Sequence, residues 1–167
     1  MQNVQSVADQ LGVRRPGDKS VSDDLRLPQA IRDLDLGPIK FKLKNDASLN
    51  WSEDEINTAE NEYRKFLALS LDNPLNEPNV PCGHVDKFWH QHMLDSAKYC
   101  EETQAIFGHY LHHFPYFGML SEEDERAMFA AGTRTLARYR EKFGEPPYVW
   151  TAPEHCFDNC RKGCSTN

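Results

Sequence analysis

The sequence predicts a small all-α protein: a single-domain helical bundle of about four to five helices, with irregular N- and C-terminal arms. Three observations predict it. The length of 167 residues suits one domain. Apolar residues recur at helical spacing along three long stretches, and the single alternating stretch has no second strand pattern nearby to pair with. We expect an N-terminal arm over 1–35, a helical domain over 36–145 and a cysteine-rich tail over 146–167.

The N-terminal arm is polar and weakly patterned, with short helical pieces expected near Val4–Leu11 and Asp23–Leu34. The segment 36–44 permits two interpretations. Its apolar residues alternate with lysines as in a half-buried strand, whereas Pro38 suits the first turn of a helix. We favour the helix because no partner strand is predicted.

The next helix has a clear beginning and end. Ser52 and Glu55 have the spacing of a capping box, in which each side chain bonds the other residue's free backbone N–H. Trp51 and Ile56 flank this box as a hydrophobic staple would. The pair Asn73–Pro74 ends the helix. We assign this helix to packing and give it no chemistry.

Two more helices complete the predicted domain. The central one is expected from about His84 to Phe107, with Gly108 as a left-handed stop. The last one is capped by Ser121, is followed by acidic residues that favour a helix N-terminus, and ends before Gly144.

Five of the seven histidines lie between residues 86 and 118. On a helix, Asp86 and His90 are four residues apart and lie side by side, so they either share a metal or Asp86 orients the ring of His90. His92 points about 200° away from His90, so an undistorted helix cannot direct both at one ion. His92 is therefore either a further ligand or a core histidine that must find a hydrogen-bond partner.

His112 and His113 follow the helix stop among aromatic residues. If the chain forms another helical turn there, both rings can converge on one side. Sheltered neutral imidazoles with a carboxylate are typical of zinc and non-haem iron sites. We expect the ligands to be His90, positioned by Asp86, together with His112 and His113, and His92 and Tyr99 come next. The alternative is that His112 only caps carbonyls at the helix end.

The tail contains a second candidate metal site. Cys156, Cys160 and Cys164 are spaced four residues apart. Three thiolates, with Cys82 or His155 as a fourth ligand, suit zinc, Cu(I) or an iron–sulfur cluster. The spacing differs from the usual zinc pair of cysteines two residues apart. The alternative is that the thiols stay reduced and unligated.

Composition excludes several classes of function. A net charge of −7 and a pI near 5.5 argue against nucleic acid or an anionic membrane as a partner. No apolar run approaches the roughly 18 residues of a membrane span, and the first residues lack a secretory layout. We therefore expect a cytoplasmic protein, in which thiols stay reduced. There is no glycine-rich phosphate loop and no serine nucleophile elbow.

The motifs together resemble the glycine-rich-domain-containing-protein-like family, over about residues 36–145. The residues that carry the resemblance are Trp51-Ser52 with Glu55, Val85-Asp86, Trp89-His90, His92, Leu94-Asp95, Tyr99, Cys100, Phe107-Gly108, Leu111-His112-His113 and Pro115-Tyr116-Phe117-Gly118. Similar plant proteins keep the Trp-His-x-His portion, lack the double histidine and carry glycine-rich regions that this chain lacks. The resemblance implies an all-helical fold and no defined activity.

Our leading hypothesis is a metal-binding helical protein, for which a metal-dependent enzyme acting on a small molecule or peptide is one option and a purely structural metal is another. Iron with an open coordination position would suit an oxidoreductase, and zinc would suit hydrolysis or a structural role. The cysteine-rich tail would supply a second metal or redox site, for which copper is also a candidate. One alternative is a non-catalytic module that binds a protein partner and keeps its histidines and aromatics in a structural core. Another is that the tail is a substrate segment modified by a partner enzyme.

Overall fold

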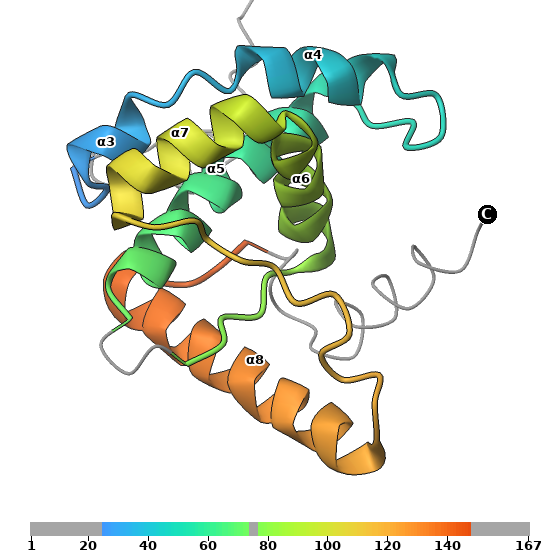
Figure 1. Ribbon diagram of the computed structural model, residues 1–167, viewed down its shortest axis with the longest axis vertical. Coiled ribbons are helices and arrows are strands. Elements are labelled where there is room, and N and C mark those ends of the chain that lie inside the picture. The colour runs from blue at the N-terminus through green and yellow to red at the C-terminus, as the bar shows by residue number, and fades with distance from the viewer. Residues whose placement is uncertain (1–24, 74–76, 148–167) are drawn as a thin grey trace, which may run out of the picture.

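A computed structural model describes residues 25–73 and 77–147 of the chain. Within these ranges the fold is entirely helical, with six helices, α3 to α8, which confirms the predicted fold class (Figure 1). The predicted helical piece near Val4–Leu11 and the tail cysteines lie outside the described residues. None of the described helices is long and apolar enough to cross a membrane.

The first two helices are short. α3 (Gln29–Arg32) is a single turn, and α4 (Gly37–Asn45) carries Pro38 in its first turn. The segment that could have been a strand is therefore a helix, as predicted. Ile39 and Leu43 of α4, one turn apart, are buried, so the helical spacing sets which face enters the core.

α5 (Glu53–Leu71) is the central helix of the bundle and contacts α3, α4, α6 and α8. The predicted capping box is confirmed: Glu55 N–H donates to Ser52 Oγ at 3.2 Å, and Ser52 N–H donates to Glu55 Oε2 at 2.8 Å. The buried face of α5 consists of Ile56, Ala59, Tyr63, Phe66 and Leu67, with Ala68 and Leu69 beside them.

The prediction of a single central helix from His84 to Phe107 is wrong. The chain forms α6 (Gly83–Leu94) and α7 (Ser96–Phe107), with a break at Asp95, where ψ is 69° (Figure 1). A straight helix of that length would extend about 36 Å in one direction. The bend instead turns α7 back toward α3 and leaves Leu94 exposed at the corner.

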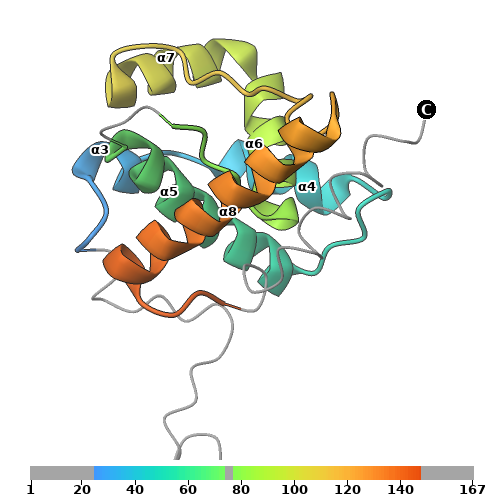
Figure 2. The ribbon, with the colours of Figure 1, turned by 90° about the horizontal axis from the view of Figure 1, so that it is seen from below.

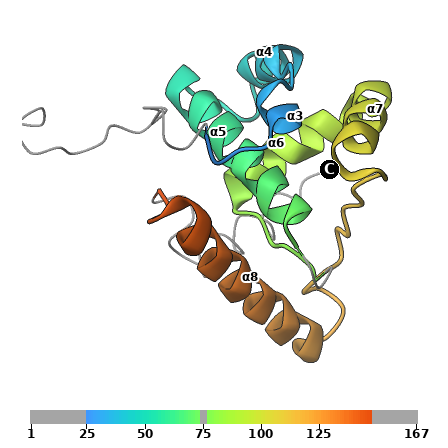
Figure 3. The ribbon, with the colours of Figure 1, turned by 90° about the vertical axis from the view of Figure 1, so that its left-hand side faces the viewer.

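α8 (Glu122–Phe143) begins and ends as predicted, with Asp124 N–H donating to Ser121 Oγ at 3.1 Å and Gly144 at a φ of 85°. It crosses α5 (Figure 2) and lies on one side of the molecule, with α4 and α7 on the other (Figure 3). Two connecting segments, 77–82 and 108–121, run between α8 and the other helices (Figure 1). The candidate site lies between these segments.

Candidate metal centre

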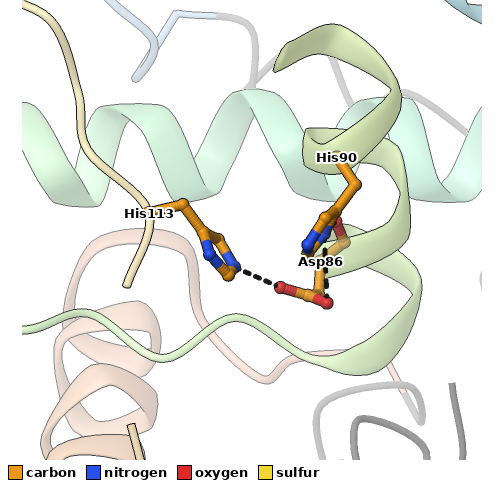
Figure 4. Close-up of side chains that lie close together, drawn as sticks. All are labelled: Asp86, His90 and His113. Carbon is orange, nitrogen blue, oxygen red and sulfur yellow. Dashed lines mark hydrogen bonds and ion pairs between the residues drawn. The ribbon is translucent and has the colours of Figure 1, made fainter. Parts of the chain in front are cut away.

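Two structural elements bring three candidate metal ligands together. Asp86 and His90 lie one turn apart on α6, and His113 reaches them from the segment 108–121 (Figure 4). The side chains of Asp86 and His113 are 18% and 15% exposed, and that of His90 is 42% exposed. One potential ligand atom from each lies within 4.8 Å of the others. Among the described residues, this is the group that has metal-site geometry.

Hydrogen bonding fixes the tautomer of His90. Its Nδ1 lies 2.7 Å from the backbone carbonyl oxygen of Asp86 and 3.3 Å from the Oδ2 atom of that residue. A carbonyl can only accept a hydrogen bond, so Nδ1 carries the proton and donates it. The neutral ring therefore keeps its lone pair on Nε2, which is a common arrangement for a metal-binding histidine.

His113 faces the same carboxylate. Its Nε2 lies 2.9 Å from Asp86 Oδ1, and its ring centroid lies 4.5 Å from that of His90. Two ligands bound at right angles to one ion, with bonds of about 2.0–2.1 Å, are also separated by about 2.9 Å. The distance therefore suits a hydrogen bond before an ion binds and two adjacent ligand positions afterwards.

Asp86 is charged throughout the physiological range. Burial by itself raises the pKa of this carboxyl, but the hydrogen bonds from His113 and His90 outweigh burial and bring the pKa to about 2. The same contact with Asp86 raises the pKa of His90, against an opposing effect of burial. A permanently ionised carboxylate between two imidazoles is a strong donor set for a divalent cation.

A chain of buried hydrogen bonds positions His113. The indole N–H of Trp89 donates to the Tyr99 hydroxyl at 2.7 Å, and that hydroxyl donates to the Leu111 carbonyl at 2.7 Å. The Trp89 ring also packs edge-on against the His113 ring, with centroids 4.7 Å apart. Tyr99, the further candidate ligand, uses its hydroxyl both to accept from Trp89 and to donate to Leu111, which lies two residues before His113.

The three ligating residues line the wall of a pocket of about 810 Å³. Its other walls come from the end of α5, the segment 77–81, the segment 111–119 and the first turns of α8. Most of the lining is apolar or aromatic, and the aromatic members are Phe66, Trp89, Phe114, Phe117 and Phe129. A deep apolar pocket with a few convergent polar groups is the usual form of a small-molecule site.

Comparison with other proteins adds no assignment. No family model, curated protein or solved structure matches this chain. The resemblance to the glycine-rich-domain-containing-protein-like family stays a prediction, so the site has to be interpreted from its own geometry.

His92 lies apart from the metal centre, on another face of α6, as the angular argument predicts. It is 1% exposed, and its Nδ1 lies 2.9 Å from the Tyr63 hydroxyl. Its Nε2 lies 2.8 Å from Glu102 Oε2, without the alignment of a good hydrogen bond. A carboxylate that close requires the proton on Nε2, so Tyr63 donates to Nδ1. Burial lowers the pKa of His92, against the opposing effect of the Glu102 carboxylate. This placement matches the core histidine that the sequence left as its alternative.

His112 also lies outside the group, because the chain does not form the further helical turn after Gly108 on which convergence of His112 with His113 depended. Residues 110–114 form no helical turn, and exposure alternates along them, with Leu111 and His113 partly buried and His112 and Phe114 exposed. His113 therefore points inward, whereas His112 is exposed at the edge of the pocket with its ring against Tyr110, the centroids 4.9 Å apart.

The tail site stays a prediction, because Cys156, Cys160 and Cys164 lie outside the described residues. Cys82, considered as a fourth thiolate, is fully buried at the start of α6. Sequence reasoning also missed Asp124, whose Oδ2 accepts hydrogen bonds from the backbone N–H groups of Gly118 and Leu120. Its position three residues after the cap Ser121 was the available signal.

Proposed function

We propose that this protein binds a divalent transition metal through Asp86, His90 and His113 and acts as a metal-dependent enzyme on a small molecule or peptide held in the adjacent pocket. One observation carries the proposal: a carboxylate and two imidazoles from separate elements converge within 4.8 Å on the wall of a large, mostly apolar pocket. The fixed tautomer of His90 and the ionised state of Asp86 support it.

The number of protein ligands favours a catalytic site over a structural one. Structural zinc is usually held by four protein ligands, whereas catalytic metals keep a position open for water or substrate. Two histidines and one carboxylate match the ligand set of non-haem iron(II) oxygenases and of zinc hydrolases. The donor set fits either metal, so iron and zinc are both candidates for the resident ion.

When bound, such a metal would supply either a polarised, acidified water for hydrolysis, in the case of zinc, or an oxygen-dependent oxidation, in the case of iron. The chain's own residues hold the site ready for it. Asp86 contributes a charge that balances the cation, and its backbone carbonyl keeps the His90 lone pair on Nε2. Phe66, Trp89 and Phe129 line the space beside the ligands, where they would orient an apolar substrate and limit water.

Metal analysis of purified protein tests the proposal. We would produce the chain without added metal, in a background with Cys156, Cys160 and Cys164 changed to serine, and measure metal content by mass spectrometry. We expect about one equivalent of iron or zinc in this background, and loss of it in His113→Ala. His112→Ala is the matched control, because that adjacent histidine is exposed and lies outside the ligand group. A content below about half an equivalent, or one unchanged by His113→Ala, would contradict the proposal.

A non-catalytic interaction module is the second candidate, favoured by one observation. Four large apolar side chains at the mouth of the pocket are between 58% and 68% exposed, namely Phe114, Tyr116, Met119 and Leu120. Exposed apolar groups gathered on one segment often mark a binding surface. Under this function, His90→Ala and His113→Ala would lower stability without changing metal content, so the same measurement separates the two candidates.

A further inference from the structure

The segment 114–120 displays four large apolar side chains, each more than half exposed. We call these four the rim: Phe114, Tyr116, Met119 and Leu120. The turn that carries them has a defined shape, because Asp124 Oδ2 accepts hydrogen bonds from Gly118 N–H at 2.6 Å and Leu120 N–H at 3.2 Å. At Gly118, where φ is 84°, an added Cβ atom would overlap Met128 Sδ. The turn therefore packs closely on α8 while its large apolar side chains stay exposed.

The rim continues the apolar lining of the pocket out onto the surface. Phe114 and Met119 belong to the rim and also line the pocket, whereas Tyr116 and Leu120 lie outside the lining. A small molecule held in the pocket would therefore leave Tyr116 and Leu120 exposed. An occupant that extends past the pocket would cover them, and burial of apolar surface favours binding. The extent of the apolar surface favours a long ligand over a compact one.

The pocket wall also offers main-chain hydrogen-bonding groups. Residues 111–115 line the pocket and form neither helix nor strand. Within the described part of the chain, the N–H groups of His112, His113 and Phe114 donate to no backbone carbonyl. Main-chain donors beside an apolar pocket suit an extended peptide, because the peptide's own N–H and C=O groups need partners when they leave water. A peptide therefore fits this wall better than an apolar molecule with few polar atoms.

The charge next to the rim is negative. The first turn of α8 consists of four acidic residues, 122–125, and the last two of them line the pocket. Arg126 lies 3.8 Å from Glu122, but both side chains are largely exposed to water, which weakens the pair. Glu77, also in the lining, is paired with Arg134 and adds no net charge. No lysine or arginine is among the described residues that line the pocket, so a ligand with a basic group is favoured.

We infer that the pocket and the rim bind an extended peptide segment, with an apolar or aromatic side chain in the pocket and a lysine or arginine beside it that faces the acidic turn 122–125. The inference rests on the proposed metal-dependent enzyme and names its substrate as a peptide. The candidate ligands Asp86, His90 and His113 line the same pocket, so the bound peptide lies beside the ion. A divalent ion outweighs the charge of Asp86, and the basic residue is therefore favoured at the acidic turn and not beside the ion.

A degenerate octapeptide library is a suitable probe, with acetylated and amidated ends so that no terminal carboxylate binds the ion. We would incubate the library with the full chain, once with zinc and once with a chelator, and identify the retained peptides by mass spectrometry. We expect a large apolar or aromatic residue next to lysine or arginine to be enriched at least about fivefold over the library. The most enriched peptide then serves for titration by fluorescence anisotropy.

Exposed positions allow substitutions that leave the fold intact. Leu120→Ser should weaken binding of this peptide about five- to thirtyfold, because the peptide buries that leucine. Leu94→Ser is the matched control, since Leu94 is 67% exposed against 68% for Leu120 and lies at the corner between α6 and α7. Glu125→Gln should weaken binding about two- to fivefold and reduce its dependence on salt. Glu101→Gln, which changes an exposed acid on α7, should do neither.

Several outcomes would overturn the inference. Retained peptides without sequence preference, or enriched in acidic residues, would remove the proposed ligand. Failure to retain any peptide would do the same, and binding of phenylethanol in that case would identify a small-molecule site. Equal losses in Leu120→Ser and Leu94→Ser would place the peptide elsewhere. The metal centre fails separately: a chain that binds no zinc but keeps the enrichment is a peptide-binding module, whereas zinc binding that depends on His113 without enrichment removes the peptide alone.

Discussion

The hydroxyl of Tyr99 provides the sharpest test of how the metal centre is held together. Tyr99 is fully buried, and its hydroxyl accepts from Trp89 Nε1–H and donates to the Leu111 carbonyl, both at 2.7 Å. Tyr99→Phe removes one atom and breaks both bonds. The buried indole N–H is left without its partner, which costs about 1–3 kcal/mol. The half-buried Leu111 carbonyl can turn to water and adds little, so we expect a loss near 2 kcal/mol.

This loss should appear in two assays. In urea unfolding of the metal-free protein, about 2 kcal/mol corresponds to a midpoint lower by roughly 1 M. In a zinc titration, affinity should fall by about ten- to a hundredfold, because the segment that carries His113 is no longer anchored. Tyr116→Phe is the matched control: its ring is 58% exposed on the same segment, and we expect less than about 0.5 kcal/mol. A Tyr99→Phe protein with unchanged midpoint and unchanged zinc affinity would refute the positioning role.

Four further predictions concern charge and metal. Asp86→Asn should destabilise the metal-free protein by roughly 2 kcal/mol at pH 7, because hydrogen bonds lower the pKa of Asp86 in the folded state from 3.8 to about 2. The difference in free energy of unfolding between wild type and variant should be complete above pH 4 and should vanish as the pH falls to 2. Urea midpoints measured over this range test it. His92→Ala should cost about 2–4 kcal/mol, chiefly by leaving the buried Tyr63 hydroxyl without its partner, since Glu102 keeps its ion pair with Lys98. Metal content should stay unchanged, and a drop in metal would mean that His92 supports the centre. Burial lowers the pKa of His92 in the folded state, so below pH 6.5, the ordinary pKa of histidine, the unfolded chain binds more protons at this residue than the folded one. The free energy of unfolding should therefore fall from pH 7.5 to 5.5 in wild type, and less steeply in His92→Ala. Equal pH slopes in the two proteins would exclude this cause. Zinc at a hundredfold excess over its dissociation constant should stabilise wild type by about 2.7 kcal/mol and His113→Ala by much less, as measured by thermal unfolding with and without a chelator.

Features decided by local chemistry could be predicted from the sequence. The capping box at Ser52 and Glu55, the cap at Ser121 and the stop at Gly144 each depend on a few neighbouring residues, and all three are present. The pairing of Asp86 with His90 follows from helical spacing alone. The angle between His90 and His92 likewise places them on different faces of α6, whatever surrounds that helix.

Features decided by packing could not be predicted in this way. Whether His112 or His113 joins the site depends on whether the chain forms another helical turn after Gly108, and the segment it forms instead is held by the bond from Tyr99 to Leu111, twelve residues away along the chain. The break at Asp95 lets α7 pack back on α3, and such a contact between distant segments cannot be predicted from the residues around Asp95 alone. The pocket itself needs walls from the segment 77–81 and from α8, which are distant from the histidines along the chain.

The ligands of the candidate centre are divided unevenly: two lie on one turn of α6, and the third lies 27 residues from Asp86, on a connecting segment. An ion shared between them would act as a removable cross-link, comparable in reach to a disulfide but governed by metal supply instead of redox conditions. Loss of the ion would then make the segment that carries His113 more mobile before any helix unfolds. Amide hydrogen exchange along 110–120 should therefore be faster in the metal-free protein than in the metal-bound protein.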